Sequence, residues 1–265
     1  MILKILQLFS FLDVNDVKKN FKIKYYRNNI MIEWNRVIYA DCMNEENGLP
    51  TLEDKSIDLC FTDPIFNINL KNNINEGKTF MERSNSQEHF FYFDNKENYE
   101  DWCKKWQQQL TRICNIVIIY CGNINKKMWY KLTNPLDEFI YFMPFNRIIT
   151  PISWIGRYRP LLLYAEKKTM AQRKLHTNVI VKKINIKNNF IHPCPLDYDL
   201  SYQIIKQLKP TSFIDPFMGS GTNAQVCKEL GIPWIGYELN EVYSQDINKR
   251  LINCRKEPQQ ITLKL

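Results

Sequence analysis

Short apolar runs alternate along the chain with segments whose apolar residues recur at helical spacing. Helical spacing is clearest over 99–113, where Tyr99, Trp102, Trp106, Leu110 and Ile113 share one face, and it recurs within 200–208 and 243–251. The apolar runs, which we predict to be strands, are 37–39, 57–61, 116–120, 161–164, 213–215 and 234–236. Regular alternation of strands and helices is typical of an α/β protein with a mostly parallel twisted sheet and helices on both faces.

Two stretches interrupt this alternation and show no steady period. Residues 67–98 are rich in Asn, Lys and Glu and are predicted to form a long excursion or lid. Residues 167–191 form the second irregular stretch, and 165–191 is predicted to be a short basic recognition segment. We therefore expect one domain over 35–255, with an N-terminal arm or extension (1–34) before it and a C-terminal tail (256–265) after it.

Charge is unevenly distributed along the sequence. The chain has 36 basic and 28 acidic side chains and a formal net charge of +8. Residues 156–190 alone carry nine basic residues against a single acid, Glu166. Such clustering favours contact with a nucleic acid, and a solvated basic surface is the alternative interpretation.

The cysteine count and the apolar runs narrow the class of protein. None of the eight cysteines forms a CxxC pair, and their spacing predicts neither a zinc site nor a disulfide framework. No apolar run reaches the roughly 18 residues of a membrane span. We expect a cytoplasmic protein of prokaryotic or viral type that has no membrane partner and binds no metal.

The segment Phe213-Ile-Asp-Pro-Phe-Met-Gly-Ser-Gly-Thr222 combines a strand, a glycine turn and a helix start. Gly219 and Gly221 allow a ligand to approach the backbone, and such a turn at a strand end forms a crevice in open α/β sheets. A second strand ends at Glu238, 23 residues after Asp215, which suits an acid that binds ribose hydroxyls. Asp215 would repel phosphate but suits a ligand with a cationic amino group and a sulfonium. An ordinary βα turn is the alternative interpretation.

The strand 57–61 leads to a second loop, Asp63-Pro64-Ile65-Phe66. An exocyclic amino nitrogen is a poor nucleophile, because its lone pair is delocalised into the ring. The Asp63 carboxylate and the Pro64 carbonyl are two acceptors that can bind its hydrogens and aim the lone pair. Phe66 offers a flat face to a base taken out of its helix, and transfer then depends mainly on positioning. Taken alone, the loop is better explained as an Asp-Pro turn at the end of a core strand.

Together these motifs resemble the amino-methyltransferases of DNA, which use S-adenosyl-L-methionine to make N6-methyladenine or N4-methylcytosine. The motif order is similar to the beta class, with the loop for the methyl acceptor (63–66, the acceptor loop) first and the loop for the cofactor (213–222, the cofactor loop) last. The match spans 35–255 and implies a Rossmann-like methyltransferase fold. Asp63, Pro64 and Phe66 match the catalytic loop usually written D-P-P-Y, from which Ile65 and Phe66 depart.

The resemblance also implies binding roles. The residues implied to contact S-adenosyl-L-methionine are Asp41, Cys42, Asp63, His192, Pro193, Asp215, Phe217, Gly219, Ser220, Gly221, Thr222, Glu238 and Leu239. Within this set, Asp41 matches the acid at the cofactor adenine, Glu238 matches the ribose-binding acid, and 192–195 matches the segment over the methionine end. Contacts to nucleic acid are expected from Arg157, Arg159, Arg173, Lys174, Lys182 and Lys183.

The substrate and the partners stay open within this family. Asp63 favours adenine N6, since Ser at this position is the usual mark of cytosine N4 enzymes. Only 27 residues separate Tyr164 from His192, so we expect a short target site, read partly by 67–98. DNA is the expected partner, and RNA, a homodimer and a cognate restriction endonuclease are left open.

Other classes of protein compete with this interpretation. The altered loop 63–66 favours a non-catalytic subunit that binds cofactor or nucleic acid, whereas the intact cofactor loop disfavours it. Pro193-Cys194 suggests a cytosine-C5 enzyme or a Cys/His hydrolase, but Asp63 occupies the acceptor loop and no third group orients His192. A nicotinamide-dependent oxidoreductase would need a third glycine in the loop that holds Gly219.

Overall fold

The computed structural model describes residues 26–27, 30–67, 96–144, 148–149, 155–173, 177–182, 190–192 and 194–254. Most of the predicted N-terminal arm, the interior of the predicted excursion and the predicted tail lie outside the described residues. So do three predicted contact residues, Lys174, Lys183 and Pro193.

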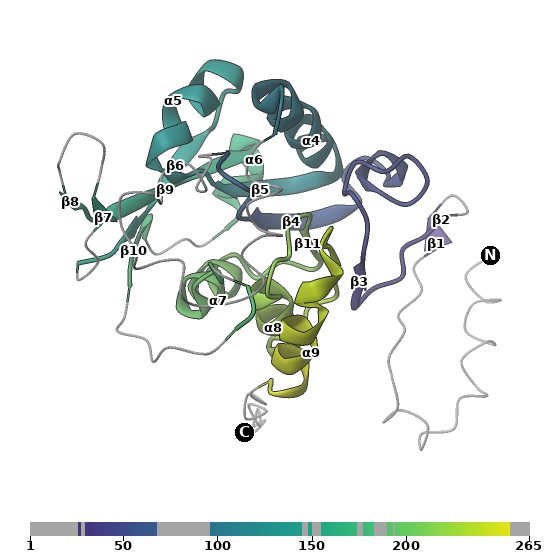
Figure 1. The fold of residues 1–265 in the computed structure, drawn as a ribbon. Helices are drawn as coiled ribbons and strands as arrows, with labels where there is room; N and C mark the ends of the chain where they lie inside the picture. Colours follow the sequence, from purple (N-terminus) through teal and green to yellow (C-terminus); the bar gives the residue numbers. More distant parts are fainter. Residues whose placement is uncertain are drawn as a thin grey trace, which may run out of the picture.

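An eight-stranded sheet with the strand order β10-β6-β9-β5-β4-β11-β12-β3 lies at the centre of the fold (Figure 1). The strands are β3 (Arg36–Ile38), β4 (Ile57–Thr62), β5 (Cys114–Tyr120), β6 (Asp137–Phe142), β9 (Tyr158–Ala165), β10 (Val179–Val181), β11 (Phe213–Asp215) and β12 (Trp234–Tyr237). Neighbouring strands are parallel except where β9 pairs antiparallel with β5 and β6. The prediction of a mostly parallel α/β sheet is confirmed.

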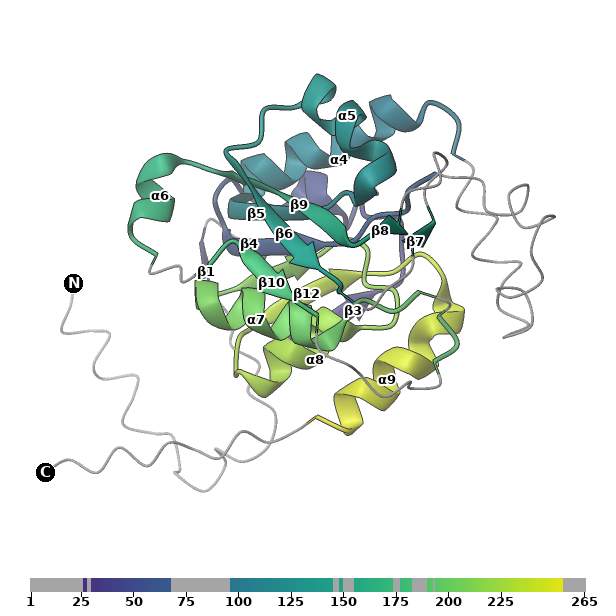
Figure 2. The same cartoon turned by 90° about the vertical axis from the view of Figure 1, so that its left-hand side faces the viewer.

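Helices cover both faces of the sheet (Figures 1 and 2). The helices α4 (Tyr99–Ile113) and α5 (Gly122–Leu132) lie on one face, and α7 (Tyr198–Leu208), α8 (Thr222–Glu229) and α9 (Ser244–Ile252) lie on the other. Every residue of β4 is buried, with Cys60 in one hydrophobic cluster and Leu59 and Phe61 in the other. Burial on both sides explains why the central strands are mostly apolar in the sequence.

Smaller elements complete the fold. They are the hairpin of β1 (Tyr26–Arg27) and β2 (Ile30–Met31), the pair β7 (Ile148–Ile149) and β8 (Ile155–Gly156), the 3₁₀ turns η2 (Leu49–Thr51) and η5 (Glu241–Tyr243), and the helix α6 (Lys167–Ala171). The prediction that 167–191 is irregular is therefore wrong in part, because α6 and β10 lie within it. β10 has only one buried residue, Ile180, so it leaves little apolar pattern in the sequence.

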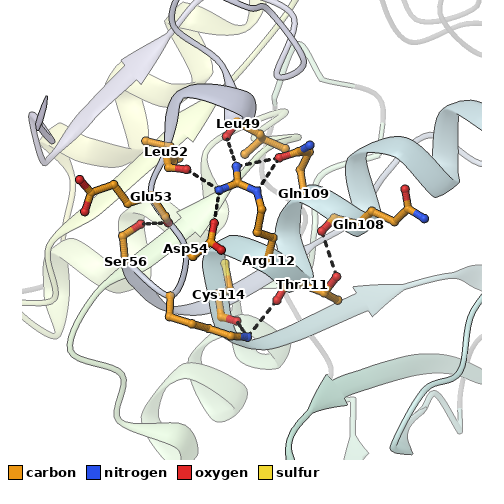
Figure 3. A network of polar contacts seen from close by, with 11 residues as sticks. Leu49, Leu52, Glu53, Asp54, Ser56, Gln108, Gln109, Thr111, Arg112 and Cys114 are labelled. Carbon is orange, nitrogen blue, oxygen red and sulfur yellow. Dashed lines mark hydrogen bonds and ion pairs between the residues drawn. The ribbon is translucent and has the colours of Figure 1, made fainter.

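At the amino-terminal edge of the parallel strands, basic side chains hydrogen-bond to backbone carbonyls and to a carboxylate (Figure 3). Near the end of α4, the Arg112 guanidinium donates to the Leu52 carbonyl at 2.7 Å and pairs with Asp54 at 2.6 Å. The Lys55 ammonium donates to the carbonyls of Thr111 and Cys114, at 2.9 and 2.8 Å. These contacts anchor the chain just before β4. They help to set the position of β4 in the sheet, and with it the position of Asp63 after its last residue.

Arg173 lies at this same edge, which corrects the prediction that it contacts nucleic acid. Its guanidinium donates to both carboxylate oxygens of Asp58, at 2.7 and 2.9 Å, and to the Leu208 carbonyl at 2.8 Å. Asp58 is a buried residue at the start of β4, and it also accepts the Thr211 amide at 2.9 Å. A buried carboxylate needs such partners, so Arg173 is held inward as a structural ion pair.

Candidate active site

The two loops singled out in the sequence follow neighbouring parallel strands. β4 delivers Asp63 directly after its last residue, and β11 ends at Asp215; the register places Ile214 beside Cys60. One pocket is lined by residues from both loops: Asp63, His192, Cys194, Leu196, Asp215, Phe217, Met218, Gly219, Ser220, Thr222 and Asn223. The structure therefore brings the predicted catalytic carboxyl group and much of the predicted cofactor loop to one cavity at the carboxyl edge of the sheet.

The turn after β11 requires glycine, both for its backbone conformation and because His192 lies close to it. Gly219 and Gly221 have φ values of 50° and 79°, a region that side-chain-bearing residues rarely adopt. A Cβ on Gly219 would lie 2.9 Å from His192 Nε2, so the imidazole leaves no room for a side chain there. The Gly219 amide donates to the Glu238 carboxylate at 2.7 Å, which links this turn to the end of β12.

His192 is positioned from α9. The buried Asp246 carboxylate accepts the backbone amides of Ile191 and His192, at 3.0 and 2.7 Å. The imidazole packs edge-on against Tyr243, with ring centroids 4.5 Å apart. Burial lowers the pKa of His192 to about 4, so the ring is neutral near pH 7.

The acceptor loop is held by α4 and α5. The Tyr99 hydroxyl donates to the Ile65 carbonyl at 2.6 Å, and the Asn125 amide donates to the Phe66 carbonyl at 2.7 Å. The Phe66 ring lies nearly parallel to that of Tyr120, at a centroid distance of 6.1 Å and an interplanar angle of 12°. Pro64 is buried. The loop is thus fixed at three successive residues, which suits a positioning role.

The two ends of the predicted excursion lie together. The Asn67 amide donates to the Lys96 carbonyl at 3.2 Å, and the Lys96 amide donates back to the Asn67 side-chain oxygen. Asn67 adopts a left-handed φ of 53° to make this contact. The segment therefore leaves and rejoins the fold beside the acceptor loop.

The acidic groups of the site lie in an environment that resists negative charge. Burial raises the pKa of Asp63 well above its usual range, nearby Asp215 raises it further, and Arg159 lowers it. Burial also raises the pKa of Asp215 to about 6 and that of Glu238 to about 7. Carboxyl groups gathered in this way favour a cationic ligand, because its charge compensates theirs.

Two functional candidates were missed in the sequence. The Thr62 hydroxyl donates to one Asp215 oxygen at 2.8 Å, and the Asn223 amide donates to the other at 2.8 Å. Thr62 directly precedes Asp63, and Asn223 directly follows the matched segment 213–222. Their adjacency to the motifs was the available signal, but their partners become visible only once β4 and β11 lie side by side.

Other predicted cofactor contacts do not line the pocket. Asp41 is exposed and accepts the Met43 amide at 2.8 Å, whereas Cys42 is buried in a hydrophobic cluster. Leu239 follows β12 and is 52% exposed. The Gly221 backbone packs against Ile247 of α9.

The remaining basic candidates lie at the carboxyl edge, with Asp63. Tyr120 at the end of β5 pairs with Leu161, so the first residues of the antiparallel β9 reach this edge. Arg157 is exposed there and donates to the Pro144 carbonyl. Arg159 is half-buried, and Lys182 lies 3.7 Å from the Asp197 carboxylate.

The described residues contain no cluster of three or more His, Cys, Asp or Glu side chains arranged to hold a metal ion. They also contain no helix with the length and apolarity that a membrane crossing requires.

Comparison with known proteins agrees with the geometry. A family model for N6 and N4 methyltransferases, described as DNA methylase, matches residues 158–249. The type II methyltransferase M.HinfI of Haemophilus influenzae is 26% identical, over 86% of this chain and 71% of its own length.

Two solved structures share the fold. The complex of M1.HpyAVI with SAM has a TM-score of 0.51 at 19% identity and covers 82% of this chain and 98% of its own. The PvuII DNA methyltransferase, described as cytosine-N4-specific, has a TM-score of 0.52 at 15% identity and covers 81% and 84%.

Proposed function

We propose that this chain, which is similar to DNA amino-methyltransferases of the N6/N4 family, transfers a methyl group from S-adenosyl-L-methionine to the N6 amino group of adenine in DNA. The observation that carries the proposal is the pocket shared by Asp63 and the Gly219 turn. Methyl transfer requires donor and acceptor to meet at one point, and the two loops open onto the same cavity.

The pocket has the chemistry that the donor requires. S-adenosyl-L-methionine supplies an electrophilic methyl group on a sulfonium, and its methionine end carries an ammonium group. Asp63 and Asp215 line the pocket and offer negative charge to such a cation. Gly219 lets the ligand approach the backbone, and we assign Glu238, which accepts the Gly219 amide, to the ribose hydroxyls.

The acceptor side is assigned to Asp63 and Pro64. The Asp63 carboxylate and the Pro64 carbonyl accept the two hydrogens of the amino group and direct its lone pair toward the methyl carbon. Asp63 must be ionised for this role, which Arg159 and the positive charge of the donor both favour. After transfer, Asp63 is positioned to take the proton that the nitrogen loses.

The choice of adenine rests on Asp63, and the choice of DNA rests on the family and on the basic edge. Arg157, Arg159 and Lys182 lie at the same edge of the sheet as Asp63, where they can contact phosphates beside the target base. Phe66 and Tyr120 present nearly parallel rings near that position. We assign Phe66 to the stacking side of the base site.

Labelled S-adenosyl-L-methionine tests the proposal directly. The protein is incubated with pools of DNA and of RNA, and the nucleosides released by digestion are analysed by mass. N6-methyladenine from DNA is the expected product. Label on cytosine N4 would replace the adenine assignment, label in RNA alone would replace the DNA assignment, and no transfer would support a non-catalytic cofactor- or nucleic-acid-binding subunit.

A further inference from the structure

A buried network at the base of the pocket joins the two loops. Both oxygens of Asp215 accept neutral side-chain donors, Thr62 Oγ1 and Asn223 Nδ2, each at 2.8 Å. The second hydrogen of Asn223 Nδ2 goes to the Phe61 carbonyl at 2.9 Å, two residues before Asp63. All three side chains are almost fully buried. We call Thr62, Asp215 and Asn223 the carboxylate clamp.

Within the part of the chain that the structure describes, the orientation of the Asn223 side chain leaves its amide oxygen buried without a hydrogen bond, which is energetically unfavourable. A carbonyl and a carboxylate can only accept hydrogen bonds, so the Asn223 nitrogen must face them and its oxygen must point elsewhere. Among the described residues, the Asn223 oxygen is buried and has no hydrogen-bond partner. Buried unsatisfied groups are rare, and they call for an explanation at the place where they occur.

We propose that Thr62 and Asn223 are positioning residues that hold Asp215 as a carboxylate facing the cationic end of the methyl donor and tie its strand to the strand that carries Asp63. This inference rests on the proposed function, because the cation is the donor. The clamp touches no reacting atom in this scheme. It acts through the charge of Asp215 and through the relative placement of the two loops.

The electrostatics of the pocket agree with this role. Burial raises the pKa of Asp215 to about 6, while the hydrogen bonds from Thr62, Asn223 and the Phe217 amide oppose that rise. Without either side-chain donor, the acid would stay protonated to a higher pH, and its negative charge would be missing near neutrality.

Other titratable groups surround Asp215. Asp63 follows β4 on one side, and Glu238 at the end of β12 lies on the other, its pKa raised to about 7 mainly by burial. Burial raises the thiol pKa values of Cys60 and Cys227 well above their usual range, so both stay neutral. His192, which also lines the pocket, is neutral near pH 7.

Equilibrium binding of S-adenosylhomocysteine between pH 5 and 8 tests the clamp. This ligand keeps the ammonium group and cannot transfer a methyl group, so the readout is independent of activity. Wild-type affinity is expected to fall as the pH drops through about 6, where Asp215 takes up a proton. Asp215→Asn is expected to bind weakly and to lose this fall in affinity at acid pH, which we call the acid limb of the binding curve. This variant therefore separates the titration of Asp215 from that of Glu238.

Thr62→Val and Asn223→Leu each remove one donor with little change in shape. Each is expected to move the pH at which binding weakens upward by about one unit, so that binding at pH 6.5 falls about threefold while binding at pH 8 changes less. Thr133→Val, at the other edge of the sheet, is the matched control, because its hydroxyl contacts the Trp129 carbonyl and the Tyr164 hydroxyl. Thermal unfolding checks that each variant is folded.

The outcomes separate the two proposals. A shifted limb in both folded variants supports the clamp. An unchanged limb in either folded variant, or an equal loss of affinity at every pH, overturns the clamp and leaves the proposed function intact. Failure of the wild-type protein to bind the ligand at any pH contradicts the proposed function itself.

Discussion

Buried carboxyl groups lie at both edges of the central sheet, but the two edges treat them differently. At the amino-terminal edge, Asp58 accepts two hydrogen bonds from one guanidinium nitrogen of Arg173 and one from the backbone amide of Thr211. At the carboxyl edge, the side-chain donors to Asp215 are the neutral groups of Thr62 and Asn223. The first edge neutralises its charge internally, which favours stability. The second leaves its charge to be compensated by a ligand, which favours binding.

Asp63→Ala should have the largest effect, and most of that effect should fall on catalysis. Loss of the acceptor for the amino hydrogens is expected to lower the methyl-transfer rate by about a hundredfold or more. Binding of S-adenosylhomocysteine should persist, because Asp215 and the Gly219 turn remain. Single-turnover rates and equilibrium binding measure the two quantities separately. A variant that retains wild-type activity would remove Asp63 from the mechanism.

Arg173→Ala should destabilise the amino-terminal edge of the sheet and leave the site intact. It leaves the buried Asp58 carboxylate without its cationic partner, and the expected loss is about 3 kcal/mol in the free energy of unfolding, measured with urea. Lys168→Ala is the control, because its pair with Glu166 is exposed and its loss should not change stability measurably. Adding Asp58→Asn to Arg173→Ala should recover part of the loss.

The same variant tests the corrected role of Arg173. The salt dependence of DNA binding by folded Arg173→Ala should match that of the wild-type protein, since the guanidinium is held at the edge away from the pocket. A flatter salt dependence would return Arg173 to the nucleic-acid surface.

A comparison of Gly219→Ala with Gly231→Ala separates the effect of a new Cβ contact from the effect of backbone strain. Both glycines have positive φ, at 50° and 69°, so each substitution should cost about 1 kcal/mol of stability. Only at Gly219 would the new Cβ meet another group, His192 Nε2 at 2.9 Å, whereas nothing lies within 4 Å of the Cβ at Gly231.

The ligand should therefore distinguish the two glycine variants. Affinity for S-adenosylhomocysteine is expected to fall about tenfold in Gly219→Ala, as a displaced loop and imidazole cost about 1.4 kcal/mol, and to stay unchanged in Gly231→Ala. Equal affinities in isothermal titration would show that His192 does not constrain the pocket.

The difference between the two edges also explains what the sequence could predict. The strands 57–61 and 213–215 were predictable because both their faces are buried and their residues are apolar except for one aspartate in each, Asp58 and Asp215. The loops that follow carry Asp63 and Gly219 in local patterns, so the shared pocket was predictable as well. The pairs Asp58–Arg173 and Thr62–Asp215 join residues 115 and 153 positions apart, which no local pattern records.

Arg173 and β10 show the two ways in which the prediction failed. A cluster of basic residues in the sequence predicts a basic surface only if each side chain points outward, and Arg173 turns inward to Asp58. β10 is an edge strand with Val179 and Val181 exposed on either side of the buried Ile180, so its three residues carry too little pattern to stand out within 165–191.

Arg157→Gln should give the smallest effect and tests which edge meets DNA. Arg157 is exposed beside the pocket edge, and removing one phosphate contact should reduce the salt slope of DNA binding, log Kd against log salt, by about 1. Arg112→Gln is the matched control at the opposite edge, where the guanidinium is occupied by Asp54 and the Leu49 and Leu52 carbonyls. Its slope should equal that of the wild-type protein. If Arg112→Gln lowered the slope and Arg157→Gln did not, DNA would lie against the amino-terminal edge, out of reach of Asp63, and the assignment of the two edges would be reversed.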